Sequence, residues 1–287
     1  MSSKIALVHA NKLFVEYNDV EKELKYKGFH IFSKYVRVFD LFFVATKSCS
    51  DETVLHAASI LYQYLDNDDD GFPDNELVYK KLVELKATMV LFHDERESEK
   101  NSSFFTKAKK NGFLIQDLEA DEICPGSTYP EYFDVSLEEC FHLVTTGYNE
   151  VYPKVFGNQH GTEIANAMDK ARGGYFPKIP KKYPDESWFS YYDKTCDYCG
   201  CMIVEYIYWA LTSILGAQEF RAHLIEDEWR CPTKESVEVT DPLVYGLLTN
   251  PKYKFATVCP QKLDKIPCFT PPQGSSGKNS TFCCVLS

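Results

Sequence analysis

The chain has 287 residues, which is long enough to bury a sizeable core as one large domain or two small ones. Hydrophobic residues make up 44% and charged residues 25%, so the composition is that of a globular protein and not of a disordered chain. The formal net charge of -11 argues against a nucleic-acid partner, because phosphate backbones are usually bound by a basic face.

The hydrophobic pattern predicts an α+β fold in which a small mixed sheet precedes a largely helical part. Apolar and aromatic runs within residues 1–50 are typical of strands or a short helix. Apolar residues then recur at helical spacing over Thr53–Leu65 and Glu76–Leu85. Short apolar runs predict buried strands at Ala87–Phe92 and Gly112–Leu118.

The rest of the chain is predicted to alternate between helices and irregular segments. Residues 94–111 form a charged, polar connection, and residues 157–200, rich in Gly, Pro and Tyr, are expected to form long irregular loops. A helix from Leu137 to about Tyr148 begins with Ser136-Leu-Glu-Glu139, the pattern of a capping box. The most apolar helix candidate is Met202–Leu215, which ends at a glycine.

The clearest chemical signal is an acidic segment between the first two predicted helices. Asp66, Asp68 and Asp70 occupy positions 1, 3 and 5 of a twelve-residue loop, and a glycine stands at position 6, where the chain must turn sharply. The carbonyl of Phe72 would serve position 7, and Asp74 stands at position 9. Alternate acidic residues curl several hard oxygen ligands around one ion, which suits Ca²⁺.

This segment resembles an EF-hand loop, and its Asp-Gly-Phe-Pro-Asp core resembles thrombospondin type 3 calcium loops more closely still. An EF-hand has a bidentate Glu at position 12, where this chain has Leu77; Glu76, one residue earlier, could substitute only with altered geometry. The resemblance implies one bound Ca²⁺. Because position 12 lacks Glu and no paired second loop is visible in the sequence, we expect this ion to stabilise the fold and not to act as a sensor. The alternative is a solvated acidic turn.

A second group of potential metal ligands lies on the predicted helix at residues 137–148, in the segment Glu138-Glu139-Cys140-Phe141-His142. Residues at i and i+4 share one helix face, so Glu138 and His142 could both reach one ion. Glu139 would then lie beside a metal-bound water as general base.

This segment resembles the His-Glu-x-x-His helix of zincin metallopeptidases, with Glu in place of the first His. Gluzincins take a third ligand from a Glu on a later helix, and Glu205 is suitably placed because a charged side chain in so apolar a helix needs a partner. His160, in His-Gly-Thr-Glu163, is another candidate ligand. The resemblance implies Zn²⁺, and the harder carboxylate ligands also accommodate Mn²⁺ or Fe²⁺.

Together these sites predict a calcium-binding, metal-dependent hydrolase that acts on peptides. A rival interpretation is a non-enzymatic calcium-binding or interaction protein, in which Ser136 and Glu139 only cap the helix, Glu138 favours the helix dipole and His142 is a core histidine. A third is a metalloenzyme of another chemistry, such as an oxygenase with His and carboxylate ligands to iron.

Three cysteines lie close together within the six residues 196–201: Cys196, Cys199 and Cys201. The C-x-x-C spacing is typical of zinc or redox sites, but a structural zinc usually needs a second pair at matching distance. Cys231 and Cys259 are too scattered to supply one. A structural role is therefore favoured, either as one disulfide or as buried thiols.

The last four residues, Cys284-Val-Leu-Ser287, match the C-a-a-X prenylation signal and resemble the tail of a Ras-type GTPase. The resemblance implies a farnesyl group on Cys284, and Cys283 could carry the second lipid that stable membrane anchoring requires. No apolar stretch suits a secretory signal or a membrane span, so we expect a cytoplasmic protein associated with a membrane surface through its C-terminus.

Three parts are expected along the chain: residues 1–135, an α+β part with the calcium loop; residues 136–260, a helical part with the metal site; and residues 261–287, a flexible tail with the prenylation signal.

Overall fold

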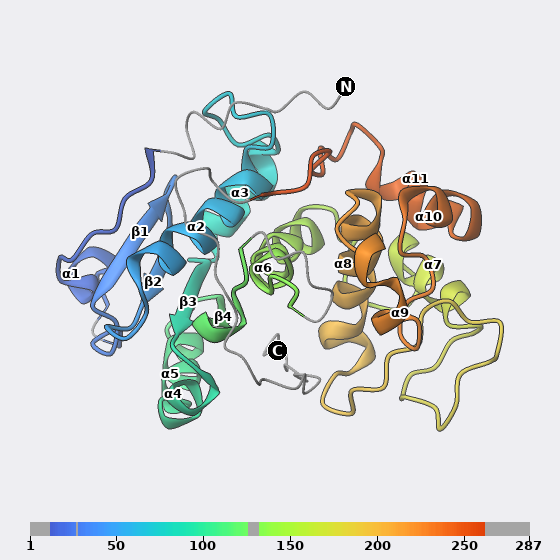
Figure 1. The fold of residues 1–287 in the computed structure, drawn as a ribbon, viewed down its shortest axis with the longest axis horizontal. Helices are drawn as coiled ribbons and strands as arrows, with labels where there is room; N and C mark the ends of the chain where they lie inside the picture. The colour runs from blue at the N-terminus through green and yellow to red at the C-terminus, as the bar shows by residue number, and fades with distance from the viewer. Residues whose placement is uncertain (1–11, 27, 126–131, 262–287) are drawn as a thin grey trace. The chain divides into compact units, whose positions relative to one another are not determined.

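The computed structural model describes residues 12–26, 28–125 and 132–261 (Figure 1). These residues form two compact units, the first made of residues 12–144 with 260–261 and the second of residues 145–259. One helix, α6 (Ser136–Val151), runs from the first unit into the second. A mixed sheet combined with many helices confirms the predicted α+β class.

The first unit is built on a four-stranded sheet of β1 (Lys34–Val38), β2 (Leu41–Ala45), β3 (Thr88–Phe92) and β4 (Ile115–Glu119), in that order. The strands β1 and β2 form an antiparallel hairpin, and β2, β3 and β4 are parallel to one another. Every residue of β3 is buried. The strand is therefore covered on both faces, which explains its continuous apolar sequence.

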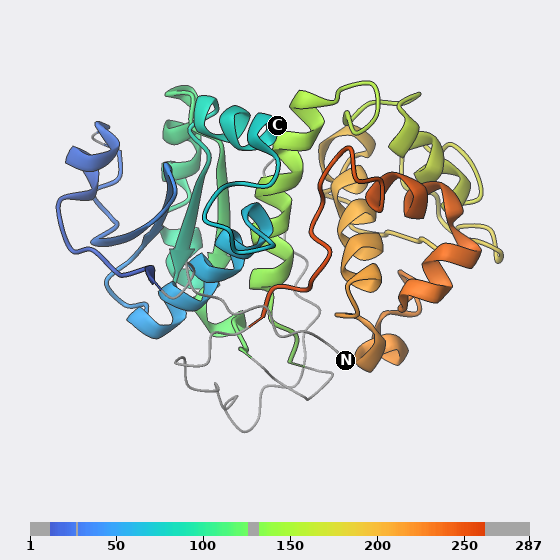
Figure 2. The ribbon, with the colours of Figure 1, turned by 90° about the horizontal axis from the view of Figure 1, so that it is seen from above.

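Helices cover the two faces of this sheet (Figures 1 and 2). On one face, Lys34 reaches Asp51 at the start of α2 (Asp51–Leu65), which packs on β1 and β2. Tyr35, which follows Lys34 in β1, points to the other face of the sheet, because side chains alternate along a strand. There it joins an aromatic core with Phe29 and with Phe104 of α5 (Ser103–Lys110).

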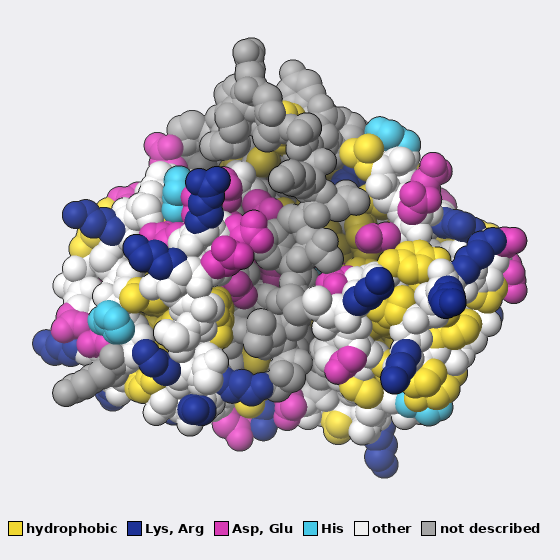
Figure 3. Space-filling model, turned by 90° about the horizontal axis from the view of Figure 1, so that it is seen from below, with side chains coloured by type: hydrophobic (Ala, Val, Ile, Leu, Met, Phe, Trp, Pro, Cys, Tyr) yellow, Lys and Arg dark blue, Asp and Glu magenta, His cyan; other side chains and the backbone are white. Residues whose placement is uncertain are grey.

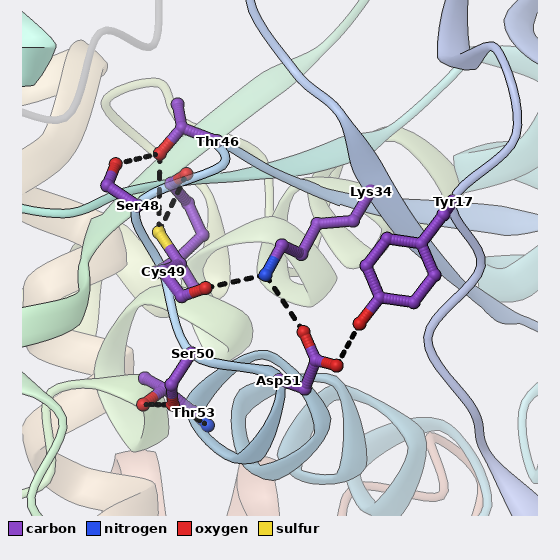
Figure 4. A network of polar contacts seen from close by, with 9 residues as sticks. Tyr17, Lys34, Thr46, Ser48, Cys49, Ser50, Asp51 and Thr53 are labelled. Carbon is purple, nitrogen blue, oxygen red and sulfur yellow. Dashed lines mark hydrogen bonds and ion pairs between the residues drawn. The ribbon is translucent and has the colours of Figure 1, made fainter.

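A polar network fixes the point at which α2 begins (Figure 4). The buried Lys34 ammonium donates to the carbonyl of Cys49, at 2.6 Å, and to Asp51 Oδ1, at 2.8 Å. The Tyr17 hydroxyl also donates to Asp51. Ser50 caps the helix by accepting a hydrogen bond from the amide of Thr53, as expected for a serine at this position.

Four further short elements complete the first unit: α1 (Val20–Leu24), α3 (Glu76–Glu84), α4 (Glu95–Lys100) and the 3₁₀ turn η2 (Ala120–Glu122). Residues 94–111, predicted only as a polar connection, thus contain both α4 and α5. Asp94 begins α4 by accepting a hydrogen bond from the amide of Glu97 at 2.9 Å. Helix α4 contains no apolar side chain and α5 buries only Phe104 and Ala108, so apolar periodicity in the sequence does not reveal either helix.

The second unit is a group of helices around α8 (Ile203–Ile214). Nearly every residue of α8 is buried, and Gly216, with φ of 80°, follows its end as predicted. Around it lie α7 (Glu163–Ala171), η3 (Tyr198–Met202), η4 (Glu219–Arg221), α9 (Ala222–Ile225), α10 (Lys234–Thr240) and α11 (Pro242–Leu248).

The helix α7 corrects the prediction that residues 157–200 form only irregular loops. Thr162 caps it by accepting a hydrogen bond from the amide of Ala165, and the helix buries Ile164 and Met168 on one side. Within the described ranges, no single helix is long and apolar enough to cross a membrane. The segments Tyr198–Ile214 and Glu219–Ile225 satisfy such a test only when taken together as a bent pair.

Candidate functional site: two clusters of metal-ligand residues

The acidic loop begins at the C-terminal end of α2, where Asp66 is the cap residue. Its carboxylate is almost completely buried and organises the loop backbone. One oxygen accepts from the amide of Asp70 at 3.0 Å, and the other accepts from the amide of Gly71 at 2.9 Å and from the Tyr62 hydroxyl at 2.6 Å. Burial raises the pKa of Asp66, and the same hydrogen bonds counteract that rise.

Asp68 and Asp70, both exposed, lie beside this buried carboxylate. One oxygen from each of Asp66, Asp68 and Asp70 lies within 4.8 Å of the others, so the three could hold one cation. The backbone reaches this geometry by turning through the left-handed region at Gly71, with φ of 92°. Glycine adopts that conformation without a steric penalty, which accounts for its place at position 6.

The remaining predicted ligands of the loop have other contacts. The Asp74 carboxylate accepts from the amide of Asn67 at 2.7 Å, and the Asp74 amide donates to the carbonyl of Leu65 at 2.8 Å, which closes the loop. Phe72 has an exposed ring, and its amide donates to Asp70. Leu77 is also exposed and offers no ligand at position 12. The roles of Asp74 and of the Phe72 carbonyl stay predictions.

The second cluster lies in the first two turns of α6. Single ligand atoms of Glu138, Glu139 and His142 lie within 4.8 Å of one another, so these three residues could hold a metal ion. His142 is fully buried, Glu139 is almost so, and Glu138 is partly exposed. Glu139 Oε2 lies 3.5 Å from His142 Nδ1. The structure thus brings Glu139 to the imidazole, as well as the predicted i,i+4 partner Glu138.

The predicted capping box at the start of α6 is wrong. Ser136 is already the first residue of the helix, and its amide and hydroxyl both donate to Asp134 Oδ1, at 3.1 and 2.6 Å. The Glu139 side chain does not turn back to the helix start, because it accepts a hydrogen bond from Gln116 of β4 at 2.5 Å. Asp134 therefore caps the helix, which leaves Glu139 available to the cluster.

Helix α2 holds this part of α6 in place. His56 of α2, which is completely buried, lies with Nε2 2.6 Å from Asp134 Oδ2. The Tyr64 hydroxyl donates to the carbonyl of Leu137 at 2.8 Å, and the Tyr64 ring packs 5.1 Å from that of Phe141. The cluster therefore lies on a helix fixed at both its start and its second turn.

Burial dominates the electrostatics of the cluster. It raises the pKa of Glu139 to about 8, with a further contribution from the nearby Asp117 and an opposing one from Gln116. Glu119 of β4 is affected in the same direction, and burial together with neighbouring carboxylates, Asp117 foremost, raises its pKa to about 9. Burial lowers the pKa of His142 to about 4, so its imidazole is neutral near pH 7 and able to coordinate a metal.

Sequence reasoning missed the residues that surround the cluster: Gln116, Asp117 and Glu119 of β4, and the pair of His56 and Asp134. One signal was available for β4. The strand Ile115–Glu119 has polar or acidic side chains at three of its five positions, which is unusual for a strand with so little exposure. The His56–Asp134 contact joins residues 78 positions apart and has no comparable signal.

The other predicted site residues belong to the second unit or lie outside the described residues. Glu205 is buried in α8, and His160 lies with Nδ1 3.3 Å from Asp169 Oδ2. Neither observation tests the predicted part of these two residues in the metal site, which stays a prediction. Cys283 and Cys284 fall outside the described ranges.

The cysteine cluster of the second unit contains a disulfide. Cys196 and Cys201 are linked, and Cys199 is an exposed free thiol. Of the two structural roles that the sequence left open, the disulfide is the one observed.

No protein-family model, no curated protein and no solved structure matches this chain. The functional interpretation therefore depends on the geometry of the two clusters.

Proposed function

We propose that the chain is a metal-dependent hydrolase, similar to a peptidase, whose metal is held by Glu138 and His142. The observation that carries the proposal is the convergence of ligand atoms of Glu138, Glu139 and His142 within 4.8 Å of one another in the first two turns of α6. A neutral imidazole beside carboxylates is a ligand set for Zn²⁺, and also for Mn²⁺ or Fe²⁺. Glu205 is the proposed third ligand, as in the gluzincins that the motif resembles.

The electrostatics of Glu139 support its proposed role as general base. A bound metal would polarise a substrate carbonyl and make its bound water more acidic. Glu139, held by Gln116 and with its pKa raised toward neutrality, would accept a proton from that water and return it to the leaving group. A carboxylate with an unshifted pKa would be a weaker base for this purpose.

Metal analysis of the purified full chain tests the ligand assignment. We expect about one equivalent of a transition metal, reduced in Glu138→Gln, His142→Ala and Glu205→Gln and unchanged in His93→Ala, which removes an exposed histidine of the first unit. Because His142 is buried, circular dichroism must show that its variant folds. If all the ligand variants are folded and keep the metal, the assignment is wrong.

Hydrolysis of a mixed peptide library, followed by mass spectrometry, tests the activity. Glu139→Gln is expected to retain the metal and lose cleavage by a factor of about a hundred or more, as expected for removal of a general base. Loss of the metal from this variant would instead make Glu139 a ligand. If the metal-loaded wild type cleaves no peptide, the chain is not a peptidase.

For the acidic loop we propose binding of one Ca²⁺ with a structural role. The supporting observation is that oxygens of Asp66, Asp68 and Asp70 converge around a turn already closed by hydrogen bonds to Asp66 and Asp74. Calcium is expected to raise the melting temperature of the wild type but not of the Asp68→Ala/Asp70→Ala double variant. An equal response of both proteins would exclude the loop as the calcium site.

The C-terminal prenylation signal stays a proposal that mass spectrometry of the native protein can decide. We propose a farnesyl group on Cys284 and a second lipid on Cys283, which would attach the chain to a membrane surface. An intact, unmodified Val-Leu-Ser end would exclude it.

A further inference from the structure

One exposed segment of the second unit has a charge opposite to that of the chain as a whole. Residues 170–183 contain five basic side chains and no acidic one, whereas the whole chain has a net charge of -11. The basic residues are Lys170, Arg172, Lys178, Lys181 and Lys182. All four lysines are exposed, and one of them, Lys182, pairs with Asp185 at 2.6 Å.

The same segment also exposes apolar and aromatic side chains. Tyr175 is 48% exposed, Pro177 is exposed, and Ile179 is partly exposed. Tyr192, 44% exposed, packs against the Tyr183 ring at the end of the segment. In Figure 3 the part of the surface on the right, which belongs to the second unit, shows apolar side chains interspersed with lysines and arginines.

Internal contacts hold this segment in a defined conformation. The fully buried Arg172 donates to the carbonyl of Phe176 at 3.1 Å and to the Tyr183 hydroxyl at 3.2 Å, and its guanidinium faces both rings. The Tyr183 amide donates to the Tyr192 hydroxyl at 3.2 Å. Since the loop is ordered by these contacts, little conformational entropy would be lost when its outer face binds a partner.

We propose that residues 175–182 and Tyr192 form a contact surface for an anionic lipid bilayer. Lysines are attracted to negatively charged headgroups, and tyrosine has an apolar ring and a polar hydroxyl that suit the membrane interface. A soluble polyanion would satisfy the lysines but would offer nothing apolar to Tyr175, Pro177 and Ile179. Asp185, which pairs with Lys182, and the exposed Glu186 lie next to the segment and lower its local charge, so Lys178 and Lys181 carry most of the attraction; charges more than about 8 Å away are screened at physiological salt.

Vesicle co-sedimentation of the full chain made in bacteria, which adds no farnesyl group, tests this surface without the proposed lipid anchor. We expect the protein to bind vesicles of phosphatidylcholine mixed with phosphatidylserine, to bind phosphatidylcholine alone poorly, and to be released by high salt. Because each lysine near such a surface contributes roughly a factor of five, Lys178→Gln/Lys181→Gln/Lys182→Gln should weaken binding by up to about a hundredfold.

A matched control uses three exposed lysines of α5, in the first unit. Lys107→Gln/Lys109→Gln/Lys110→Gln removes the same charge and should leave vesicle binding unchanged. Equal losses in the two triple variants, or no binding of the wild type to the anionic vesicles, would overturn the proposal. Binding to soluble polyglutamate without binding to vesicles would also overturn it, in favour of an acidic polypeptide partner.

The aromatic part of the surface has its own measurement. Tyr175→Trp places a fluorophore on the exposed face, whereas Trp188, Trp209 and Trp229 of the wild type are all partly or fully buried. Its emission should shift to shorter wavelength when anionic vesicles are added. An unchanged spectrum in a variant that co-sediments would show that this ring stays in water and that the contact is purely electrostatic, contrary to the proposal.

Discussion

Replacing Glu139 by Gln should stabilise the metal-free protein at alkaline pH. Burial raises the pKa of this carboxyl from its ordinary 4.5 to about 8, so the folded state holds a proton that the unfolded state has released. The contribution of this carboxyl to the free energy of unfolding is therefore fully present below about pH 4.5 and is lost as the pH rises toward 8. At 1.36 kcal/mol per pKa unit, the total loss is roughly 5 kcal/mol, of which about 3 kcal/mol falls between pH 5.5 and pH 8.

Glutamine at this position keeps the shape and one oxygen acceptor for Gln116, but it does not ionise. Urea denaturation in the presence of a chelator, at several pH values from 5.5 to 8, measures the difference. We expect the variant to lose about 3 kcal/mol less than the wild type over this range; Glu119 and Asp117, whose pKa values burial also raises, contribute to the loss that remains. Glu99→Gln, an exposed glutamate of α4, should behave as the wild type does.

The probe must report on the first unit. Trp188, Trp209 and Trp229 all lie in the second unit, so their fluorescence reports on that unit and not directly on Glu139. Circular dichroism and hydrogen exchange of the amides near Glu139 are suitable. Parallel pH curves for the wild type and Glu139→Gln would refute the reasoning, since they would show that the carboxyl ionises without penalty in the folded state.

Three further changes have expected outcomes. Gly71→Ala should lower the free energy of unfolding by about 1–2 kcal/mol, because alanine is strained at a φ of 92°. Gly246→Ala, on an exposed and open face of α11, should raise it by roughly 0.5–1 kcal/mol. Urea denaturation of both variants should therefore give changes in the free energy of unfolding that are opposite in sign. His56→Ala should cost roughly 1–3 kcal/mol by removing the partner of Asp134, and hydrogen exchange should increase first at the start of α6; uniform exchange along the helix would contradict a capping role. Leu211→Ala in α8 should cost about 2–5 kcal/mol and lower the melting temperature of the second unit, measured by tryptophan fluorescence.

Local patterns in the sequence predicted the fold where apolar periodicity is strong. The helix expected at residues 53–65 is α2, and the strand expected at residues 87–92 is β3, each within two residues of its ends. The prediction missed α5 and α7. Helix α5 buries only Phe104 and Ala108, and three of the five residues that α7 buries are alanines; α7 also depends on its Thr162 cap and on packing against α8 and α11. Such contacts join residues far apart in the chain and leave no local signal.

The same distinction applies to the metal cluster. Glu138 and His142 were predictable together because i and i+4 positions share a helix face whatever the tertiary structure is. The role of Glu139 was not, because it depends on Gln116, 23 positions earlier, and on the carboxylate of Asp117. Spacing therefore indicated which side chains could meet, whereas the ionisation of each was set by burial and by residues of a different element.

The orientation of the cluster depends on two separate contacts with one helix. His56 holds the cap residue Asp134, and this contact alone would fix where α6 begins but would allow it to rotate about its axis. Tyr64, two turns further along α2, contacts Leu137 and Phe141 and prevents that rotation. Because α2 is itself fixed at its first turn by Lys34 and ends at the buried Asp66, the order of the acidic loop and the geometry of the Glu138–His142 turn depend on the same helix.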